Sequence, residues 1–335
     1  MEALEAVRDN HAIIAAVAVL LVTLSWTFFS RVTRWLQRAS FAFWCNNFTK
    51  RTGVCDAKLE KVELSSRAQR RLAACGTSPN YILEHVTRLG STYHPIRAPA
   101  GYICLAIAEN KITFEPWLRD KLATFRPQVE DMGYDDNRGC APFRKELAAL
   151  MSRHTKGLQI DPDHLCAAAG IAAVIELLLT AICDDGDGVL VPVSCFSGFK
   201  SNFNRVGVEL VPGGAGVSLF RDSMDDVLKV FERDIEGARS RGVCVKALLT
   251  SNPHNPSGQV LPLERLLQLL QWTEEQQIHL IVDEVYANSV YADGVEFVSA
   301  AALSAVPTDR LHVIYGLAKD FAMAGARVGV GYSSS

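Results

Sequence analysis

Short apolar runs alternate with helix-like segments through the second half of the chain, and this alternation limits the possible folds. Pro142 to His154 carries helical spacing of apolar residues, and Ala172 to Cys183 is a strongly apolar helix after Gly170. Six β-rich runs then follow: Gly188 to Val193, Val206 to Val211, Val245 to Thr250, His279 to Val282, Leu311 to Tyr315 and Arg327 to Tyr332. Such a pattern predicts an α/β domain whose parallel-type sheet is covered on both faces. In such sheets, ligands bind at the carboxyl ends of the strands.

Two of the runs lead into polar residues that suit a ring cofactor. Residues 251–258 contain two Asn-Pro dipeptides and a glycine, which predict a rigid turn, and the amide of Asn255 could bond a ring oxygen. Residues 281–286 lead from a buried strand into Asp283, and a buried carboxylate needs a partner. A protonated pyridine nitrogen would serve, because the pair would keep the ring able to take up electrons. Taken singly, Asn255 fits an ordinary loop and Asp283 fits a helix N-cap or an ion pair.

Two cations follow the next run. Lys319 lies just past the run that ends at Tyr315, and Arg327 lies eight residues further on. Burial would lower the pKa of Lys319 and make its amine able to form an imine with an aldehyde. The forked guanidinium of Arg327 suits a phosphate. Taken singly, each fits an ordinary surface charge.

The spacing of these four residues resembles a known pattern. Asn255 and Asp283 are 28 residues apart, Asp283 and Lys319 are 36 apart, and Lys319 and Arg327 are 8 apart, as in enzymes of the aspartate aminotransferase type. The stretch from Lys319 to Gly329 is similar to the lysine motif of aminocyclopropane-carboxylate (ACC) synthases. The chain therefore resembles the class I/II aminotransferase superfamily, which binds pyridoxal 5'-phosphate (PLP), and most of all its ACC synthase-like members.

The resemblance implies a fold and a set of roles. The fold is the large domain of PLP-dependent transferases, with a mostly parallel seven-stranded sheet, helices on both faces and an N-terminal arm. Lys319 would form the Schiff base (aldimine) with PLP and move protons. The cofactor would also contact Asp283 at its pyridine nitrogen, Asn255 and Tyr286 at its phenolic oxygen, and Arg327 at its phosphate.

Upstream segments add further residues through the same resemblance. Residues 107–111 are similar to the ACC synthase segment that places a Glu near the substrate, which nominates Glu109. Residues 195–199 resemble the loop whose aromatic ring stacks on the cofactor, which nominates Phe196. The amides of Ala172 and Ala173, at a helix N-terminus after Gly170, would offer a phosphate site.

The chain departs from the family pattern at several positions. Ala172, Gly316 and Ala318 stand where relatives commonly place hydroxyl groups around the phosphate, and Asn137 stands where they place a phosphate-reaching tyrosine. Relatives also continue into a C-terminal small domain that carries the arginine for the substrate carboxylate. We expect this domain to be missing, because the predicted sheet ends at Tyr332 and the chain at Ser335.

Two functions remain open at this point. The first is a PLP-dependent enzyme acting on amino acids, either an aminotransferase or an ACC synthase-like lyase. The second is a catalytically impaired, membrane-attached remnant or partner subunit of such an enzyme. A nicotinamide-dependent dehydrogenase is excluded, because no G-x-G-x-x-G turn follows the first strand. The family resemblance also implies a homodimer.

The N-terminus predicts a membrane anchor. Ala12 to Phe29 is an uncharged, mostly apolar run of 18 residues, which is close to the shortest length that spans a bilayer. Basic residues follow it, so the positive-inside rule places the rest of the chain in the cytosol. We expect an anchor at residues 1–38, a connector at 39–63 and the aminotransferase-like domain at 64–335. The alternative is a cytoplasmic protein whose apolar helix packs on the domain.

Charge and cysteine content narrow the possible partners. The 34 basic and 37 acidic residues nearly balance, which argues against nucleic-acid binding. The nine cysteines are scattered without C-x-x-C spacing, and we interpret them as reduced thiols rather than disulfides or metal ligands.

Overall fold

The computed structural model describes residues 64–75, 80–105 and 107–333. From Ser65 onward the chain forms one compact unit. The expected anchor at residues 1–38 and the connector at 39–63 lie outside the described residues and stay predictions. Within the described ranges, no helix has the length and apolar content that crossing a membrane requires.

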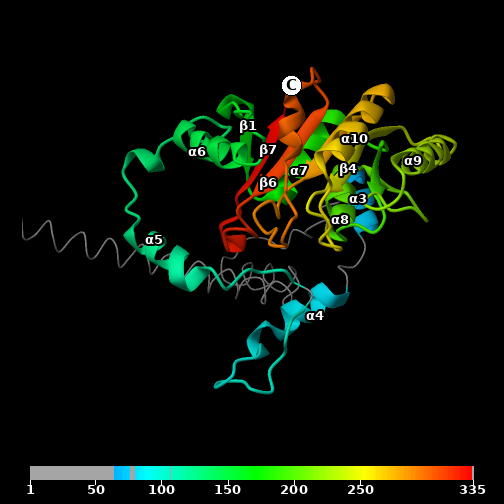
Figure 1. Ribbon diagram of the computed structural model, residues 1–335. Helices are drawn as coiled ribbons and strands as arrows, with labels where there is room; N and C mark the ends of the chain where they lie inside the picture. The colour runs from blue at the N-terminus through cyan, green and yellow to red at the C-terminus, as the bar shows by residue number, and fades with distance from the viewer. Residues whose placement is uncertain (1–63, 76–79, 106, 334–335) are drawn as a thin grey trace, which may run out of the picture. The chain divides into compact units, whose positions relative to one another are not determined.

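Helices and strands alternate as the sequence predicts (Figure 1). The helices are α3 (Ser66–Cys75), α4 (Asn80–Arg88), α5 (Arg119–Thr124), α6 (Ala141–Ser152), α7 (Ile171–Ile182), α8 (Gly198–Val206), α9 (Met224–Arg239) and α10 (Leu263–Glu275). The strands are β1 (Leu165–Ala168), β2 (Gly188–Pro192), β3 (Glu209–Gly213), β4 (Val245–Ser251), β5 (His279–Asp283), β6 (Leu311–Gly316) and β7 (Gly329–Ser333).

The strands form a single mixed sheet of seven, in the order β1-β7-β6-β5-β4-β2-β3. The five strands from β6 to β3 run parallel, and β7 pairs antiparallel with both β6 and β1. The predicted fold class, a mostly parallel sheet of seven strands in an α/β domain, is confirmed. Parallel neighbours require crossover connections, which is why helices separate the strands in sequence.

The central strands are apolar on both faces because each face packs on its own layer of helices. Along β4, Ala247 and Leu249 face a core that α7 and α8 complete, whereas Leu248 faces the core shared with α6, α9 and α10. The same alternation holds in β5 and β6. Since successive side chains of a strand point to opposite faces, a strand buried on both sides is mostly apolar along its length.

The two edge strands of the sheet, β1 and β3, differ most from the prediction. The run from Val206 to Val211 was expected to be one strand, but α8 continues through Val206 and ends at Gly207, whose φ of 80° supplies a left-handed cap. Strand β3 begins only at Glu209. Strand β1 was not expected at all, because its four residues are too short to show a period.

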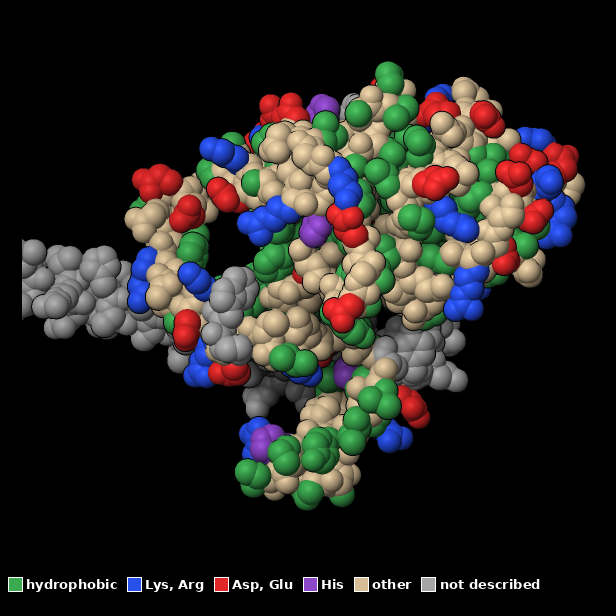
Figure 2. All heavy atoms as spheres, in the orientation of Figure 1, with side chains coloured by type: hydrophobic (Ala, Val, Ile, Leu, Met, Phe, Trp, Pro, Cys, Tyr) green, Lys and Arg blue, Asp and Glu red, His purple; other side chains and the backbone are tan. Residues whose placement is uncertain are grey.

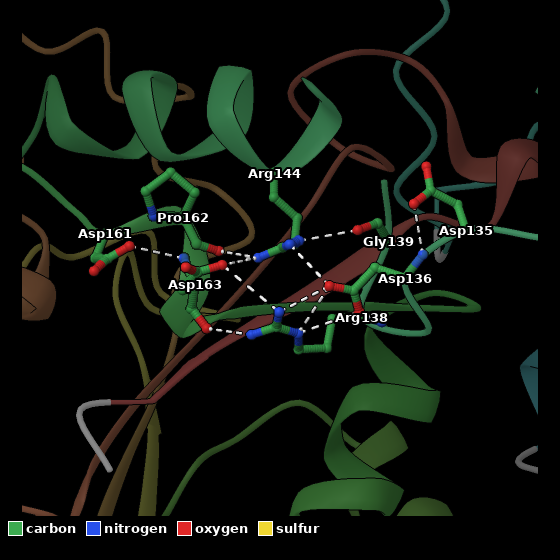
Figure 3. Close-up of polar contacts among 8 residues, drawn as sticks. All are labelled: Asp135, Asp136, Arg138, Gly139, Arg144, Asp161, Pro162 and Asp163. Atoms are coloured by element: carbon green, nitrogen blue, oxygen red, sulfur yellow. Dashed lines mark hydrogen bonds and ion pairs between the residues drawn. The ribbon is translucent and has the colours of Figure 1, made fainter. Parts of the chain in front are cut away.

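A network of ion pairs fixes the segment before α6 (Figure 3). Arg144, only 4% exposed, reaches from α6 to the carbonyls of Gly139 and Pro162 at 2.9 and 2.8 Å. It also pairs with Asp136 at 3.0 Å and Asp163 at 2.8 Å. The network therefore ties the loop at residues 136–139 to the turn that precedes β1.

The carboxylate of Asp136 gives this network a pH dependence. Arg138, which bonds to it, lowers the pKa of Asp136 to about 2, with a smaller contribution from Arg144. Because this folded-state pKa lies below the ordinary value of 3.8, the stabilisation is complete above pH 3.8 and is lost as the pH falls toward 2.

We predict that Arg144→Ala destabilises the protein by about 2–3 kcal/mol, because the carbonyls of Gly139 and Pro162 lose this donor and the ion pairs to Asp136 and Asp163 are lost from a nearly buried position. Urea unfolding at pH 7 would measure the loss. Arg239→Ala is the control: it pairs with Glu236 outside this network, its side chain is 69% exposed, and such pairs contribute little. Equal losses in the two variants would contradict the role given to Arg144.

Candidate active site

Three loops meet at the carboxyl edge of the sheet, because β4, β5 and β6 are parallel and end in register. Ser251 pairs with Asp283, and Asp283 pairs with Ile314. The backbone ladder continues past the strands, since the amide of Asn252 donates to the carbonyl of Asp283 at 2.9 Å. The loops after these strands hold Asn255, Asp283, Tyr286 and Lys319, so residues up to 64 positions apart in sequence share one edge.

Asp283 is a buried carboxylate, 6% exposed, at the end of β5. Its Oδ1 accepts a hydrogen bond from the amide of Val285 at 3.2 Å. Burial raises the pKa of Asp283 to about 6, and the Val285 bond and the charge of Lys319 oppose that rise. The arrangement favours a cationic ligand, because such a ligand would stabilise the ionised form.

Lys319 lies half-buried in the turn that follows β6. Its Nζ donates to the carbonyl of Ala108 at 2.6 Å, and its own carbonyl accepts from Nδ2 of Asn110 at 3.3 Å. Burial lowers the pKa of Lys319; Glu109 and Asp283 oppose this effect, while Arg327 adds to it. A lowered pKa makes more of the neutral, nucleophilic amine available near pH 7.

Glu109 lies on the segment that contacts Lys319, next to Ala108. Its carboxylate pairs with Lys111 at 3.0 Å and is 42% exposed. The carboxylate is also close enough to Lys319 to raise the pKa of that lysine. The sequence nominated Glu109 as a substrate residue, and the structure brings its charge near Lys319.

Asn255 and Tyr286 line one cavity of about 610 Å³. The loop of Asn255 is fixed because the backbone amide of Asn255 donates to Ser251 Oγ at 3.1 Å. Burial raises the pKa of the Tyr286 phenol, and the charges of Asp283 and Asp320 raise it further. Tyr286 therefore keeps its proton at neutral pH and can donate a hydrogen bond.

A cationic cup forms where the N-terminus of α7 meets the start of β7. Gly170 precedes α7 with a φ of 87°, and a Cβ on it would clash with the guanidinium of Arg327. A Cβ on Gly329 would in turn clash with the backbone of Gly170 and Ile171. The two glycines thus allow a close approach that sets a positive side chain over a helix N-terminus, where anions bind.

The positions that lack hydroxyl groups have different surroundings. A side chain at Gly316 would come within 3.0 Å of both Ile171 Cγ1 and the carbonyl of Val328, so a serine there would force its neighbours to shift. Ala172 and Ala318 are half-buried. The amide of Ala173 donates to the carbonyl of Gly170 at 3.0 Å, so Ala172 is better placed than Ala173 to offer its N–H to a ligand.

Phe196 and Asn137 are both exposed. The ring of Phe196, 41% exposed, packs edge-on against Phe199 at 5.4 Å and covers Gly198. His254 bonds to the backbone of Ser194, which links the loop of Phe196 to that of Asn255. Asn137 is exposed on the loop that Arg144 fixes.

Glu284, next to Asp283, was not singled out from the sequence. It is 2% exposed and accepts hydrogen bonds of 2.6 Å from Ser299 Oγ and from the amide of Ala300. Burial raises the pKa of Glu284 to about 8. Each oxygen of Glu284 accepts a hydrogen bond, whereas among the described residues the only bond to the Asp283 carboxylate is the one from Val285 to Oδ1. Nothing in the sequence separates the two neighbouring carboxylates.

The raised pKa of Asp283 makes the cofactor-free protein less stable as the pH rises. The unfolded carboxylate ionises near 3.8 and the folded one near 6, so the stabilisation is complete below 3.8 and is lost as the pH rises through about 6. We predict that Asp283→Asn is more stable than the parent by about 3 kcal/mol at pH 8 and about equal to it at pH 4.

Guanidinium unfolding of the cofactor-free protein at pH 4, 6 and 8 would measure this difference. Asp293→Asn, at an exposed loop position, should show no pH-dependent gain. A constant difference between Asp283→Asn and the parent at all three pH values would contradict the burial of an ionising Asp283.

Comparisons with known proteins bear on this site. A family model for aminotransferases of class I and II matches residues 104–335. The chain is 35% identical over 290 residues to "Probable aminotransferase ACS12" of Arabidopsis thaliana, a match that covers 82% of this chain and 57% of that protein. It is 30% identical over 255 residues to "Probable inactive 1-aminocyclopropane-1-carboxylate synthase-like protein 2" of Mus musculus, with 72% and 43% covered.

The chain thus spans about half the length of the curated relatives that it matches. Among solved structures, a mutant aspartate aminotransferase of Thermus thermophilus superposes with a TM-score of 0.57 over 82% of this chain and 65% of that one. The identity is 22%, so this likeness shows the shared fold alone.

Proposed function

Because the chain belongs to the class I and II aminotransferase family and is similar to its ACC synthase-like members, we propose that it is a PLP-dependent enzyme acting on amino acids through Lys319. Whether it transfers the amino group or acts as an ACC synthase-like lyase depends on which substrate bond breaks. The observation that carries the proposal is the buried Asp283 near a half-buried lysine of lowered pKa, at the ends of adjacent strands.

The cofactor of this family is PLP, and the site has the donors and charges that PLP needs. The buried carboxylate of Asp283 fits the pyridine nitrogen. Asn255 and Tyr286 fit the phenolic oxygen, and the Phe196 ring offers a stacking face. The cup of Arg327 and the amide of Ala172 fits the phosphate, and Lys319 fits the aldehyde. When bound, PLP supplies an electron sink for negative charge at the α-carbon of an amino acid.

The chain's own residues would then share the work as follows. Lys319 would hold the cofactor covalently until substrate arrives, and its freed amine would take the proton from the substrate α-carbon. Asp283 would stay ionised opposite the cofactor ring. Glu109, whose charge lies near Lys319, would orient the substrate.

A second candidate is a catalytically impaired homologue. The mouse relative named as probably inactive and the hydroxyl-free positions Ala172, Gly316 and Ala318 favour it. Such a protein would keep the fold and lose the ability to hold PLP at Lys319. One experiment separates the two candidates.

We predict that PLP followed by borohydride reduction modifies the parent protein at Lys319. The lowered pKa of this lysine and the nearby cationic cup should direct the aldehyde there rather than to exposed amines. Mass mapping of peptides would locate the adduct. Lys319→Ala should lose it, and Lys200→Ala, at an exposed position on α8, should keep it.

An adduct that is spread over surface lysines, or that is unchanged in Lys319→Ala, would contradict the enzyme proposal and favour the impaired homologue. Asp283→Asn should form the same adduct more weakly, since it removes the anion proposed to pair with the ring nitrogen.

We also propose that the protein is a homodimer. Exposed apolar side chains gather on the segment that begins with α4, as Figure 2 shows. Ile103, Leu105 and Ile112 are 61%, 93% and 87% exposed. Apolar surface of this kind is typical of interaction sites.

We predict that replacing Leu105 and Ile112 together by Glu weakens self-association about tenfold or more. Losses of this size are common when residues at the centre of an interface are changed. Sedimentation of the full chain over a range of concentrations would measure it. Leu177→Glu, at an exposed apolar position on α7, is the control. A parent that sediments as a monomer at all concentrations would contradict the dimer.

A further inference from the structure

Asp320, the residue after Lys319, joins the turn after β6 to the turn after β5. Its Oδ1 accepts from Ser289 Oγ at 2.6 Å. Its Oδ2 accepts from the backbone amide of Asn288 at 2.9 Å, from Nδ2 of Asn288 at 3.2 Å and from the hydroxyl of Tyr315 at 3.1 Å. Both oxygens are therefore engaged, and Asn288 and Ser289 lie more than 30 residues away in sequence.

This arrangement requires both carboxylate oxygens of Asp320 to accept hydrogen bonds. An ionised carboxylate only accepts, so a single group can receive all four donors at once. Hydrogen bonds to a charged acceptor are shorter and stronger than those between neutral groups. An Asn in place of Asp320 could keep the acceptor for Asn288 and Tyr315 and turn its amide toward Ser289, whose hydroxyl can also accept. An Ala would lose every bond.

The two turns joined in this way are the ones that hold the candidate cofactor residues. The amide of Ser289 donates to the carbonyl of Tyr286 at 2.9 Å, so the Asn288–Ser289 turn is continuous with the residue proposed to hold the phenolic oxygen. Beyond it, Oδ1 of Asn288 meets Nε2 of His154 at 3.0 Å, which anchors this turn to the segment after α6. Asn110 holds the carbonyl of Lys319 from the other side.

We propose that Asp320 is a positioning residue: it clamps the Lys319 turn to the Asn288–Ser289 turn and thereby sets where the Lys319 amine lies relative to Tyr286 and Asp283. The clamp itself is a property of the described residues. Its value for catalysis rests on the proposed function, because only an enzyme that holds a cofactor between these turns needs their spacing fixed.

Hydrogen exchange of the cofactor-free protein tests the clamp. Asp320→Ala should exchange about tenfold or more faster in peptides covering residues 284–290 and 317–323, since hydrogen bonds to a charged group are lost. Asp320→Asn should be intermediate. Asp309→Ala, at an exposed position before β6, should match the parent.

A double-mutant cycle assigns the effect to the contact. Ser289→Ala alone should loosen the same peptides, and adding it to Asp320→Ala should change little, because the partner is already gone. Additive effects, or faster exchange over the whole protein, would contradict a local clamp.

The pH dependence of reductive methylation at Lys319, followed by mass spectrometry without cofactor, tests the position of the amine. A loosened turn exposes the amine to water, which relieves the burial that lowers the pKa of Lys319, so the labelling midpoint should move to higher pH in Asp320→Ala. Asp320→Asn should stay close to the parent. Loss of the negative charge alone would move the midpoint to lower pH, and equally in both variants.

These readouts separate the two proposals. A parent without a Lys319–PLP adduct contradicts the proposed function, whereas the exchange and methylation results still decide the role of Asp320. Unchanged exchange in the two turns, or a methylation midpoint that does not rise in Asp320→Ala, would overturn the positioning role even if the PLP adduct forms.

Discussion

The burial of Asp283 at the end of β5 is the constraint around which the site is built. A carboxylate in this position raises the free energy of the cofactor-free fold, because its ionised form has lost most of its hydration. The chain supplies the amide of Val285 and the charge of Lys319, and the pKa still rises to about 6. A cationic ligand would offset this cost. The site therefore resembles other functional sites in holding a group that destabilises the fold without its ligand.

The cationic cup depends on a different constraint, the close approach of backbone to backbone. Gly170 and Gly329 lie where any side chain would collide with Arg327 or with the start of α7. Arg327 itself adopts a left-handed conformation, with φ of 56°, which is unusual for a residue with a side chain. The cup is thus set by the packing of α7 against β7. The same packing crowds position 316, so a side chain that carries a hydroxyl would fit there only if its neighbours shifted.

Much of this could be predicted from the sequence, and what could not has physical causes. The central strands were recognisable because burial on both faces makes residues such as 247–249 and 280–282 apolar without interruption. Strand β1 escaped notice because it is short, and Val206 was misplaced because a β-branched residue also fits the last turn of a helix. Spacing nominated Asn255, Asp283, Lys319 and Arg327 as site residues, whereas the partners of Asp320 gave no such signal. Asn288 and Ser289 look like ordinary turn residues, and only the register of β5 and β6 brings them to that carboxylate.

The buried and half-buried charges discussed above fall into two classes: those that hold loops in place and those that are available to a ligand. Arg144 and Glu284 are nearly inaccessible and are surrounded by donors or acceptors of the chain itself. Asp320 belongs with them, because four donors saturate it. Asp283 and Lys319 differ. Each perturbs the pKa of the other, yet within the part of the chain that the structure describes, the Asp283 carboxylate accepts one hydrogen bond, from the Val285 amide, and the Lys319 amine donates one, to the Ala108 carbonyl. Charges of the first class hold the loops in place, and the loops they hold keep the charges of the second class at the edge of the sheet, where a ligand can reach them.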